Sequence, residues 1–139
     1  MDELAVRVEW NGKVLRVLDP ISMLGCKLQL VAHLPQGNRR DVMHLRTLLP
    51  CVRGFLTEFL HQVERGEIPA RHWLNAASHV LKLTTDERAK KIGRKYQINW
   101  TEILPLAAIT KSRDEKIRRF HELQLRQGYR KPKGISTGL

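Results

Sequence analysis

The side chains best suited to chemistry in this sequence are a group of cations in its second half. Five basic residues stand close together with no acid among them: Arg88, Lys90, Lys91, Arg94 and Lys95. Their spacing includes two pairs four residues apart, so a single helix would display them as a broad cationic face. Tyr96 and Trp100 follow closely and could stack on bases. The pattern is typical of a nucleic-acid-binding surface, and a solvated helix face with core aromatics is the alternative.

Positive charge is also concentrated in the second half of the chain. The formal net charge is +11, and residues 88–139 hold 14 basic and four acidic side chains. Ten of the eleven excess positive charges therefore lie in this segment. Such a gradient indicates a polyanionic partner near the C-terminal half. Solubility combined with a basic tail would explain it equally well.

The other nucleophiles and metal ligands form no recognisable pattern. The six histidines are scattered without a His-Glu-x-x-His frame, which argues against a zinc site. The serines lack the context of a nucleophile elbow. Cys26 and Cys51 lie in apolar runs, so we expect buried free thiols in a reducing compartment. We predict no catalytic residue and no metal ligand in this chain.

A β-hairpin is predicted over residues 4–18. Leu4, Val6 and Val8 alternate with polar residues, and the dipeptide Asn11-Gly12 suits the positive φ angles of a type I′ turn. A lone hairpin is marginally stable in water. Its apolar face must therefore be covered, either by the helices that follow or by strands that this sequence does not contain.

Helical spacing dominates the rest of the sequence. Asp19 and Pro20 predict a helix start, as a capping acid and a first-turn proline. The strongest signal is an apolar stripe over residues 42–63, with a bend expected at Pro50 and an end at Gly66. A helix is also expected over residues 70–83. Three further helix starts are predicted where a capping residue stands three before a glutamate, at Thr84, Asn99 and Ser112.

The predicted fold class is α+β and mostly α, with an N-terminal β-hairpin followed by five or six helices. Residues 1–128 are expected to form a single domain, with the hairpin at 4–18 and the helical part at 20–128. Residues 129–139 contain proline and glycine but no apolar pattern, so a flexible, disordered basic tail is expected there.

Two segments of the chain are similar to parts of a known protein family. One runs Val14-Leu15-Arg16-Val17-Leu18-Asp19-Pro20-Ile21 and continues with Leu24, Lys27 and Leu28, and the other is Arg39-Arg40-Asp41-Val42 with Leu45. With residues 92–105, they resemble the helical region that follows the catalytic sheet in minimal nucleotidyltransferases of the toxin or abortive-infection type. The resemblance extends over most of residues 5–105.

This resemblance implies a phosphate-binding role for three residues. It places Lys27 near the nucleotide phosphates, where an ammonium group acts by charge, and it marks Arg40 and Asp41 at the start of the next helix. The alternatives are a lysine whose stem borders the core, a surface arginine, and an acid that favours the helix dipole.

The chain departs from this family in the residues that would do the chemistry. Enzymes of this fold carry a Gly-Ser or Gly-Gly turn and clustered carboxylates, because two divalent metal ions need hard oxygen ligands. The sequence has no Gly-Ser, Gly-Gly or Asp-x-Asp. We therefore expect no activity from this chain alone, with Mg²⁺ and a nucleoside triphosphate bound only if a catalytic partner completes the site.

Three functions remain open at this point. The first is an incomplete or non-catalytic nucleotidyltransferase-like domain, truncated or split, that binds nucleotide or nucleic acid or completes an active site with a protein partner supplying the catalytic sheet. The second is a small basic nucleic-acid-binding module, and the third is an antitoxin-like partner protein. The absence of a signal-peptide pattern and of a long apolar run predicts a cytoplasmic protein without a membrane partner.

Overall fold

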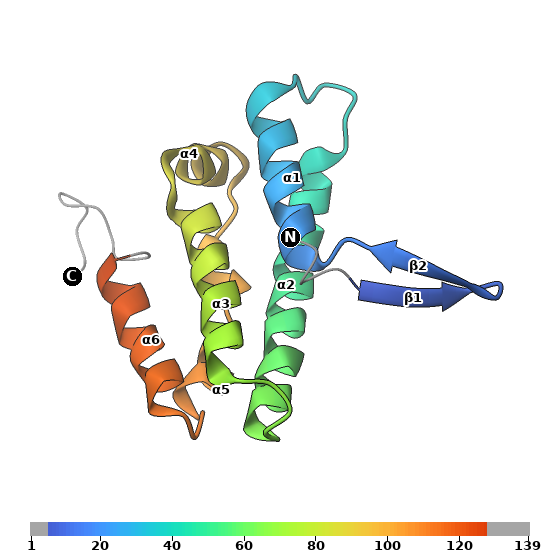
Figure 1. The fold of residues 1–139 in the computed structure, drawn as a ribbon. Helices are drawn as coiled ribbons and strands as arrows, with labels where there is room; N and C mark the ends of the chain where they lie inside the picture. Colours follow the sequence, from blue (N-terminus) through green and yellow to red (C-terminus); the bar gives the residue numbers. More distant parts are fainter. Residues whose placement is uncertain (1–5, 128–139) are drawn as a thin grey trace.

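The computed structural model describes residues 6–127, in which a β-hairpin is followed by six α-helices and one 3₁₀-helix (Figure 1). The elements are β1 (Val6–Trp10), β2 (Lys13–Val17), α1 (Pro20–His33), α2 (Asp41–Glu64), α3 (Ala70–Thr85), α4 (Glu87–Tyr96), η2 (Trp100–Ile103), α5 (Leu106–Thr110) and α6 (Glu115–Gln127). The predicted fold class, mostly α with an N-terminal hairpin, is confirmed. The predicted tail at residues 129–139 lies outside the described residues.

The hairpin has the predicted turn. β1 and β2 pair antiparallel, from Val6 opposite Val17 to Trp10 opposite Lys13. Asn11 and Gly12 both have positive φ angles, of 50° and 74°, which a two-residue type I′ turn requires. The two strands form a sheet of their own and project sideways from the helices (Figure 1).

Helix α1 begins as the sequence predicts. The buried carboxylate of Asp19 accepts hydrogen bonds from the backbone nitrogen of Ser22, at 2.9 Å, and from its hydroxyl group, at 2.8 Å. Pro20 occupies the first helical position, where the missing N–H is not needed. These residues set the direction in which α1 leaves the hairpin.

Helix α2 is the predicted long helix. It runs without a break through Pro50, and its buried face includes Leu45, Leu49, Val52 and Leu56. The helix ends at Glu64, and Gly66, which has a φ of 76°, follows the capping residue Arg65. Backbone hydrogen bonds from residue 66 to residue 63 and from residue 67 to residue 62 close the end as a Schellman motif.

Two of the three predicted capping residues are wrong. Thr84 belongs to the last turn of α3, where its hydroxyl group donates to the carbonyl oxygen of Val80. Asp86 caps α4 instead, since its carboxylate accepts from the backbone nitrogen of Ala89 at 2.7 Å. A carboxylate two residues further on outcompetes the hydroxyl group because it is the stronger acceptor.

The same displacement occurs before α6. Asp114 accepts from the backbone nitrogens of Lys116 and Ile117, while the hydroxyl group of Ser112 donates to Glu64 across the molecule. Asn99 does cap a helix, but that helix is the four-residue η2.

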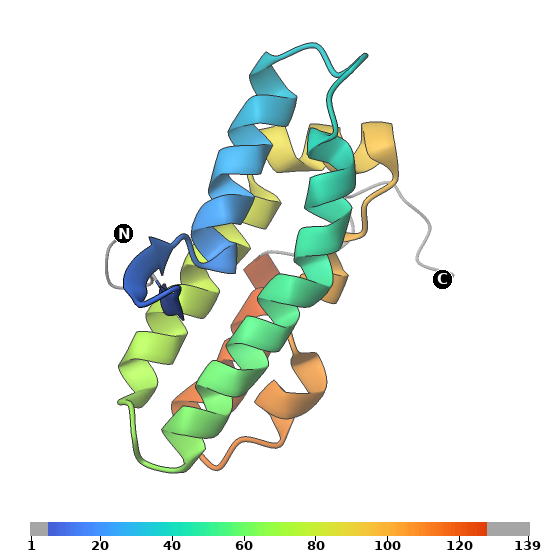
Figure 2. The ribbon, with the colours of Figure 1, turned by 90° about the vertical axis from the view of Figure 1, so that its right-hand side faces the viewer.

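The core lies between the helices and is built around Trp73 on α3. Its side chain is fully buried, its ring meets Phe120 edge-on at 5.8 Å, and its indole nitrogen donates to the carbonyl oxygen of Leu56 at 2.9 Å. Ile21, Leu24 and Leu28 close the core from α1. Figure 2 shows α4 running across α1 and α2 near one end of the molecule, and Figure 1 shows the same helix end-on.

Candidate functional site

The structure brings together two of the three residues that the resemblance marks. Lys27 lies on α1 and Asp41 is the first residue of α2, and the lysine Nζ is 2.9 Å from Oδ1 of the aspartate. Arg39 donates from Nε to the other carboxylate oxygen at 2.5 Å. The carboxylate side chain is 4% exposed and the lysine 21%. We call these three residues the α1–α2 ion cluster.

Asp41 is held in its ionised form by these neighbours. Hydrogen bonds from Arg39 and then from Lys27 lower the pKa of the carboxyl group below its ordinary 3.8, against the opposing effect of burial. The aspartate therefore stays charged wherever the protein is near neutral pH. Its position in the first turn of α2 also complements the positive end of that helix.

The ammonium group of Lys27 keeps donors to spare. It carries three N–H groups, and Asp41 is its sole hydrogen-bond partner within residues 6–127. Since the side chain is one-fifth exposed, the remaining donors can meet an anion from solvent. One carboxylate against the two cations leaves the cluster with a formal net charge of +1.

Arg40 lies outside the α1–α2 ion cluster. It precedes α2, its side chain is exposed, and it makes no side-chain capping hydrogen bond. Arg39, which the sequence analysis did not select, takes the position beside Asp41. Helical spacing does not predict this contact, because Arg39 lies two residues before Asp41, in the loop that leads into α2.

The basic residues of α4 divide into two groups. Arg88 is partly buried and bonds to Gln29 on α1 and to Asp86. The other four side chains are exposed: Lys90, Lys91, Arg94 and Lys95. We call these four the α4 basic face.

Of the two predicted stacking aromatics, Trp100 is buried and Tyr96 is partly exposed. Trp100 is 6% exposed and its indole nitrogen donates to the carbonyl oxygen of Ala89 at 2.8 Å. Tyr96 is partly buried, with the ammonium group of Lys95 5.3 Å from its ring centroid. The alternative reading of Trp100, a core aromatic beneath a solvated helix face, therefore describes its position, and the ring is removed from the candidate site.

An arginine of α2 also contacts the end of α4. Arg46 on α2 is exposed and donates from its guanidinium group to the carbonyl oxygen of Tyr96 at 2.7 Å, at the end of α4. No local pattern predicts this contact, because its partners lie 50 positions apart in the sequence. It places one more cation beside the α4 basic face.

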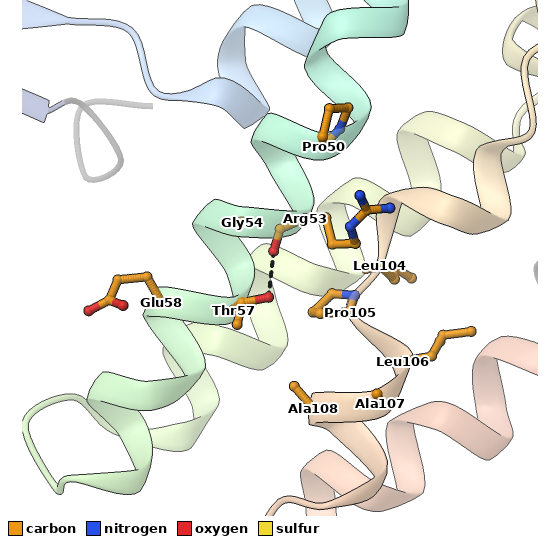
Figure 3. Close-up of a pocket in the computed structure, with 10 residues that line it drawn as sticks. All are labelled: Pro50, Arg53, Gly54, Thr57, Glu58, Leu104, Pro105, Leu106, Ala107 and Ala108. Atoms are coloured by element: carbon orange, nitrogen blue, oxygen red, sulfur yellow. Dashed lines mark hydrogen bonds between the residues drawn. The ribbon is translucent and has the colours of Figure 1, made fainter.

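The structure also contains an open groove of about 490 Å³ between α2 and the segment that leads into α5 (Figure 3). It is lined by Pro50, Arg53, Gly54, Thr57, Glu58, Leu104, Pro105, Leu106, Ala107 and Ala108. The Arg53 guanidinium group already donates to the carbonyl oxygen of Glu102. Figure 3 shows the Thr57 hydroxyl group bonded to the backbone of its own helix. The lining offers no cluster of titratable groups.

The cysteines differ from the prediction. Cys26 and Cys51 are free, as expected, but both side chains are exposed. Each cysteine lies in an apolar run of the sequence but off the buried face of its helix. An apolar run therefore does not by itself show that a residue within it is buried.

Among residues 6–127, no group of three or more histidine, cysteine, aspartate or glutamate side chains is placed to hold a metal ion.

No helix within the described part of the chain has both the length and the apolar character needed to cross a bilayer. Comparisons with protein families, with curated proteins and with solved structures found no match to this chain.

Proposed function

We propose that this chain is the helical half of a nucleotidyltransferase-like site, in which Lys27 binds nucleotide phosphates and another polypeptide segment supplies the catalytic carboxylates. The observation that carries the proposal is the ion pair between Lys27 and Asp41. These residues are 14 positions apart, and both belong to the segments that carry the resemblance.

The chemistry of the α1–α2 ion cluster supports this role. A lysine that is partly exposed and anchored at one N–H presents a fixed positive charge to solvent. Asp41 acts as a positioning residue, because it holds the ammonium group at the junction of α1 and α2. Because Lys27 is already anchored, it loses less conformational entropy when a phosphate binds.

The hairpin supplies a place for the missing half. Both edges of its two-stranded sheet lack a neighbouring strand among the described residues, and α1 follows it directly. Open edges of this kind pair readily with further strands. A carboxylate-bearing sheet joined at either edge would lie next to the helix that carries Lys27, and it would bring Mg²⁺ ligands, of which residues 6–127 hold no cluster.

Nucleotide binding by the chain alone tests the role of Lys27. Titration of ¹⁵N-labelled protein with the Mg²⁺ complexes of the four nucleoside triphosphates should shift amide signals around Lys27 and the start of α2. Half a site should bind weakly, with a Kd on the order of 1 mM. Lys27→Ala should weaken binding at least about tenfold, because it removes the phosphate-facing cation.

Lys111→Ala is the matched control, and it should bind as the parent does. It deletes an exposed lysine next to Ser112, which bonds to Glu64 at the opposite end of α2 from Asp41. Equal binding by the parent and the Lys27 variant would refute the phosphate role. Absence of any shift near Lys27 at saturating nucleotide would refute it as well.

A transfer assay tests the other part of the proposal. With labelled nucleotide, Mg²⁺ and candidate RNA or protein acceptors, the chain alone should transfer nothing above background, because two-metal chemistry needs clustered carboxylates. Robust transfer by the purified chain would show that the site is complete, and the proposal of a half site would fail.

A further inference from the structure

The α4 basic face carries positive charge that acidic side chains within residues 6–127 do not neutralise. Lys91 and Arg94 have no ion-pair or hydrogen-bond partner in the described part of the chain, and the nearest acid to Lys90 is Glu87 at 3.9 Å. The ammonium group of Lys95 lies over the ring of Tyr96, and within the described residues it forms no ion pair. Single exposed cations without an ion-pair partner among the described residues, such as Arg71 and Lys111, also occur on other elements. On α4, four exposed cations stand within residues 90–95, and this concentration of positive charge distinguishes the helix.

These cations also repel one another. Lys90 and Arg94 are four residues apart on the helix, as are Lys91 and Lys95, and like charges at this spacing destabilise a helix. The helix forms because its other face is anchored: Ala89 and Ile92 are buried, and the Trp100 indole nitrogen bonds to the carbonyl oxygen of Ala89. A polyanion bound along the exposed face would relieve the repulsion.

The geometry of the face suits a phosphate backbone. Lys90 and Lys95 are separated by about 7.5 Å along the helix axis, from the rise of 1.5 Å per residue. This length is comparable to about two nucleotide steps of a duplex strand, at 3.4 Å per step. Arg46 extends the positive surface from α4 onto α2.

We propose that the α4 basic face, with Arg46, binds the phosphodiester backbone of a nucleic acid without reading its sequence. Backbone contact follows from the charges. Sequence-independent binding is expected because contacts from lysine and arginine to phosphate oxygens carry no base information. The buried Trp100 ring is not placed to stack on bases. This proposal depends on residues other than Lys27, so its test is independent of the test of the nucleotide site.

Fluorescence anisotropy with a labelled RNA of about 16 nucleotides tests the proposal. If four contacts form, the affinity for a single strand should fall about fifty-fold between 50 and 200 mM salt, from a slope of about 0.7 per contact. The variant K90A/K91A/R94A/K95A should lose at least about tenfold in affinity at low salt and most of its salt dependence. Oligonucleotides of unrelated sequence should bind alike.

The control variant removes the same number of exposed cations from elsewhere: R71A/K111A/K116A/R119A. These residues belong to the start of α3, the end of α5 and the start of α6, at the opposite end of the molecule from α4 (Figure 1). The control should bind RNA as the parent does, and circular dichroism should show both variants folded.

Three results would overturn the proposal. The α4 variant could bind as tightly as the parent, which would place the binding surface elsewhere. Both variants could weaken equally, which would make net charge the cause. Poly-L-glutamate could compete as well as RNA at equal charge, which would exclude specific recognition of a phosphodiester backbone. Parallel titrations with single-stranded and duplex DNA of the same sequence identify the preferred form of nucleic acid.

Discussion

At the scale of single residues, Asp41 is the side chain whose environment has the clearest consequence. It is nearly buried between two cations that lower the pKa of its carboxyl group. In the unfolded chain it recovers its ordinary pKa, so it binds protons more readily there than in the folded protein. Its contribution to stability is therefore complete above the unfolded pKa and is lost as the pH falls through the lower folded value.

Replacement of Asp41 by asparagine should accordingly make the free energy of unfolding less dependent on pH. We expect the stability difference between the parent and Asp41→Asn to be constant above about pH 5 and to shrink as the pH falls toward 2. Urea unfolding followed by circular dichroism across this range measures it. A difference that stays constant down to pH 2 would mean that the ion pair does not stabilise the fold.

The sequence predicted some of these residues and missed others for physical reasons. The spacing of Lys27 and Asp41 does not by itself predict that they meet, because 14 positions and a loop separate them. Arg46 has no sequence signal, because its partner is a backbone carbonyl group fifty residues away. For Trp100 the sequence leaves a stacking and a core position open, because a single sequence does not reveal whether an aromatic residue beside a basic cluster faces solvent or core.

At the scale of elements, the packing of α4 against η2 depends on a glycine. A Cβ atom built on Gly93 would lie 2.9 Å from the indole nitrogen of Trp100 and 3.1 Å from the carbonyl oxygen of Ile98. Neither neighbour moves easily, because the ring is buried and the other atom is backbone. Gly93 therefore allows α4 to approach the segment that carries Trp100.

Gly93→Ala should destabilise the protein by roughly 1–2 kcal/mol, because overpacking outweighs the gain in helix propensity. Gly54→Ala is the matched control: it lies within α2, and an added Cβ meets nothing within 4 Å. That change should stabilise the protein by about 0.5–1 kcal/mol. Thermal and urea unfolding measure both, and a stabilising Gly93→Ala would contradict the tight approach.

The elements themselves were largely predictable, and their ends were less so. The hairpin turn and the stripe of α2 follow from local rules, since positive φ angles need Asn-Gly and a buried face needs apolar residues at helical spacing. The caps at Thr84 and Ser112 failed because an aspartate stood two residues further along in each case. Two acceptors so close together compete, and a sequence pattern does not rank them.

At the scale of the whole molecule, the described core belongs to the helices. Its buried apolar residues run from Ile21 to Phe120, while the hairpin pairs with itself and projects from the helical part (Figure 1). Val14 and Leu18 are 62% and 53% exposed. The helical part should therefore hold its structure without the two strands.

Deletion of residues 1–17 should leave a cooperatively folded protein with a Tm within about 5 °C of the parent, because it retains Asp19 and the core. Circular dichroism and a thermal melt provide the measurement. A chain that melts without a cooperative transition would show that the hairpin stabilises the helices in ways that its extended position does not indicate. Solubility should increase if the deleted edges are sites of association.

The exposure of Cys26 and Cys51 has a practical consequence for spectroscopy. One thiol lies on α1 and the other on α2, the two helices that the α1–α2 ion cluster joins. Nitroxide labels can therefore be attached to the wild-type sequence, and the distance distribution between them can be recorded before and after nucleotide is added. The two native cysteines thus allow the separation of α1 and α2 to be measured at the junction where Lys27 lies.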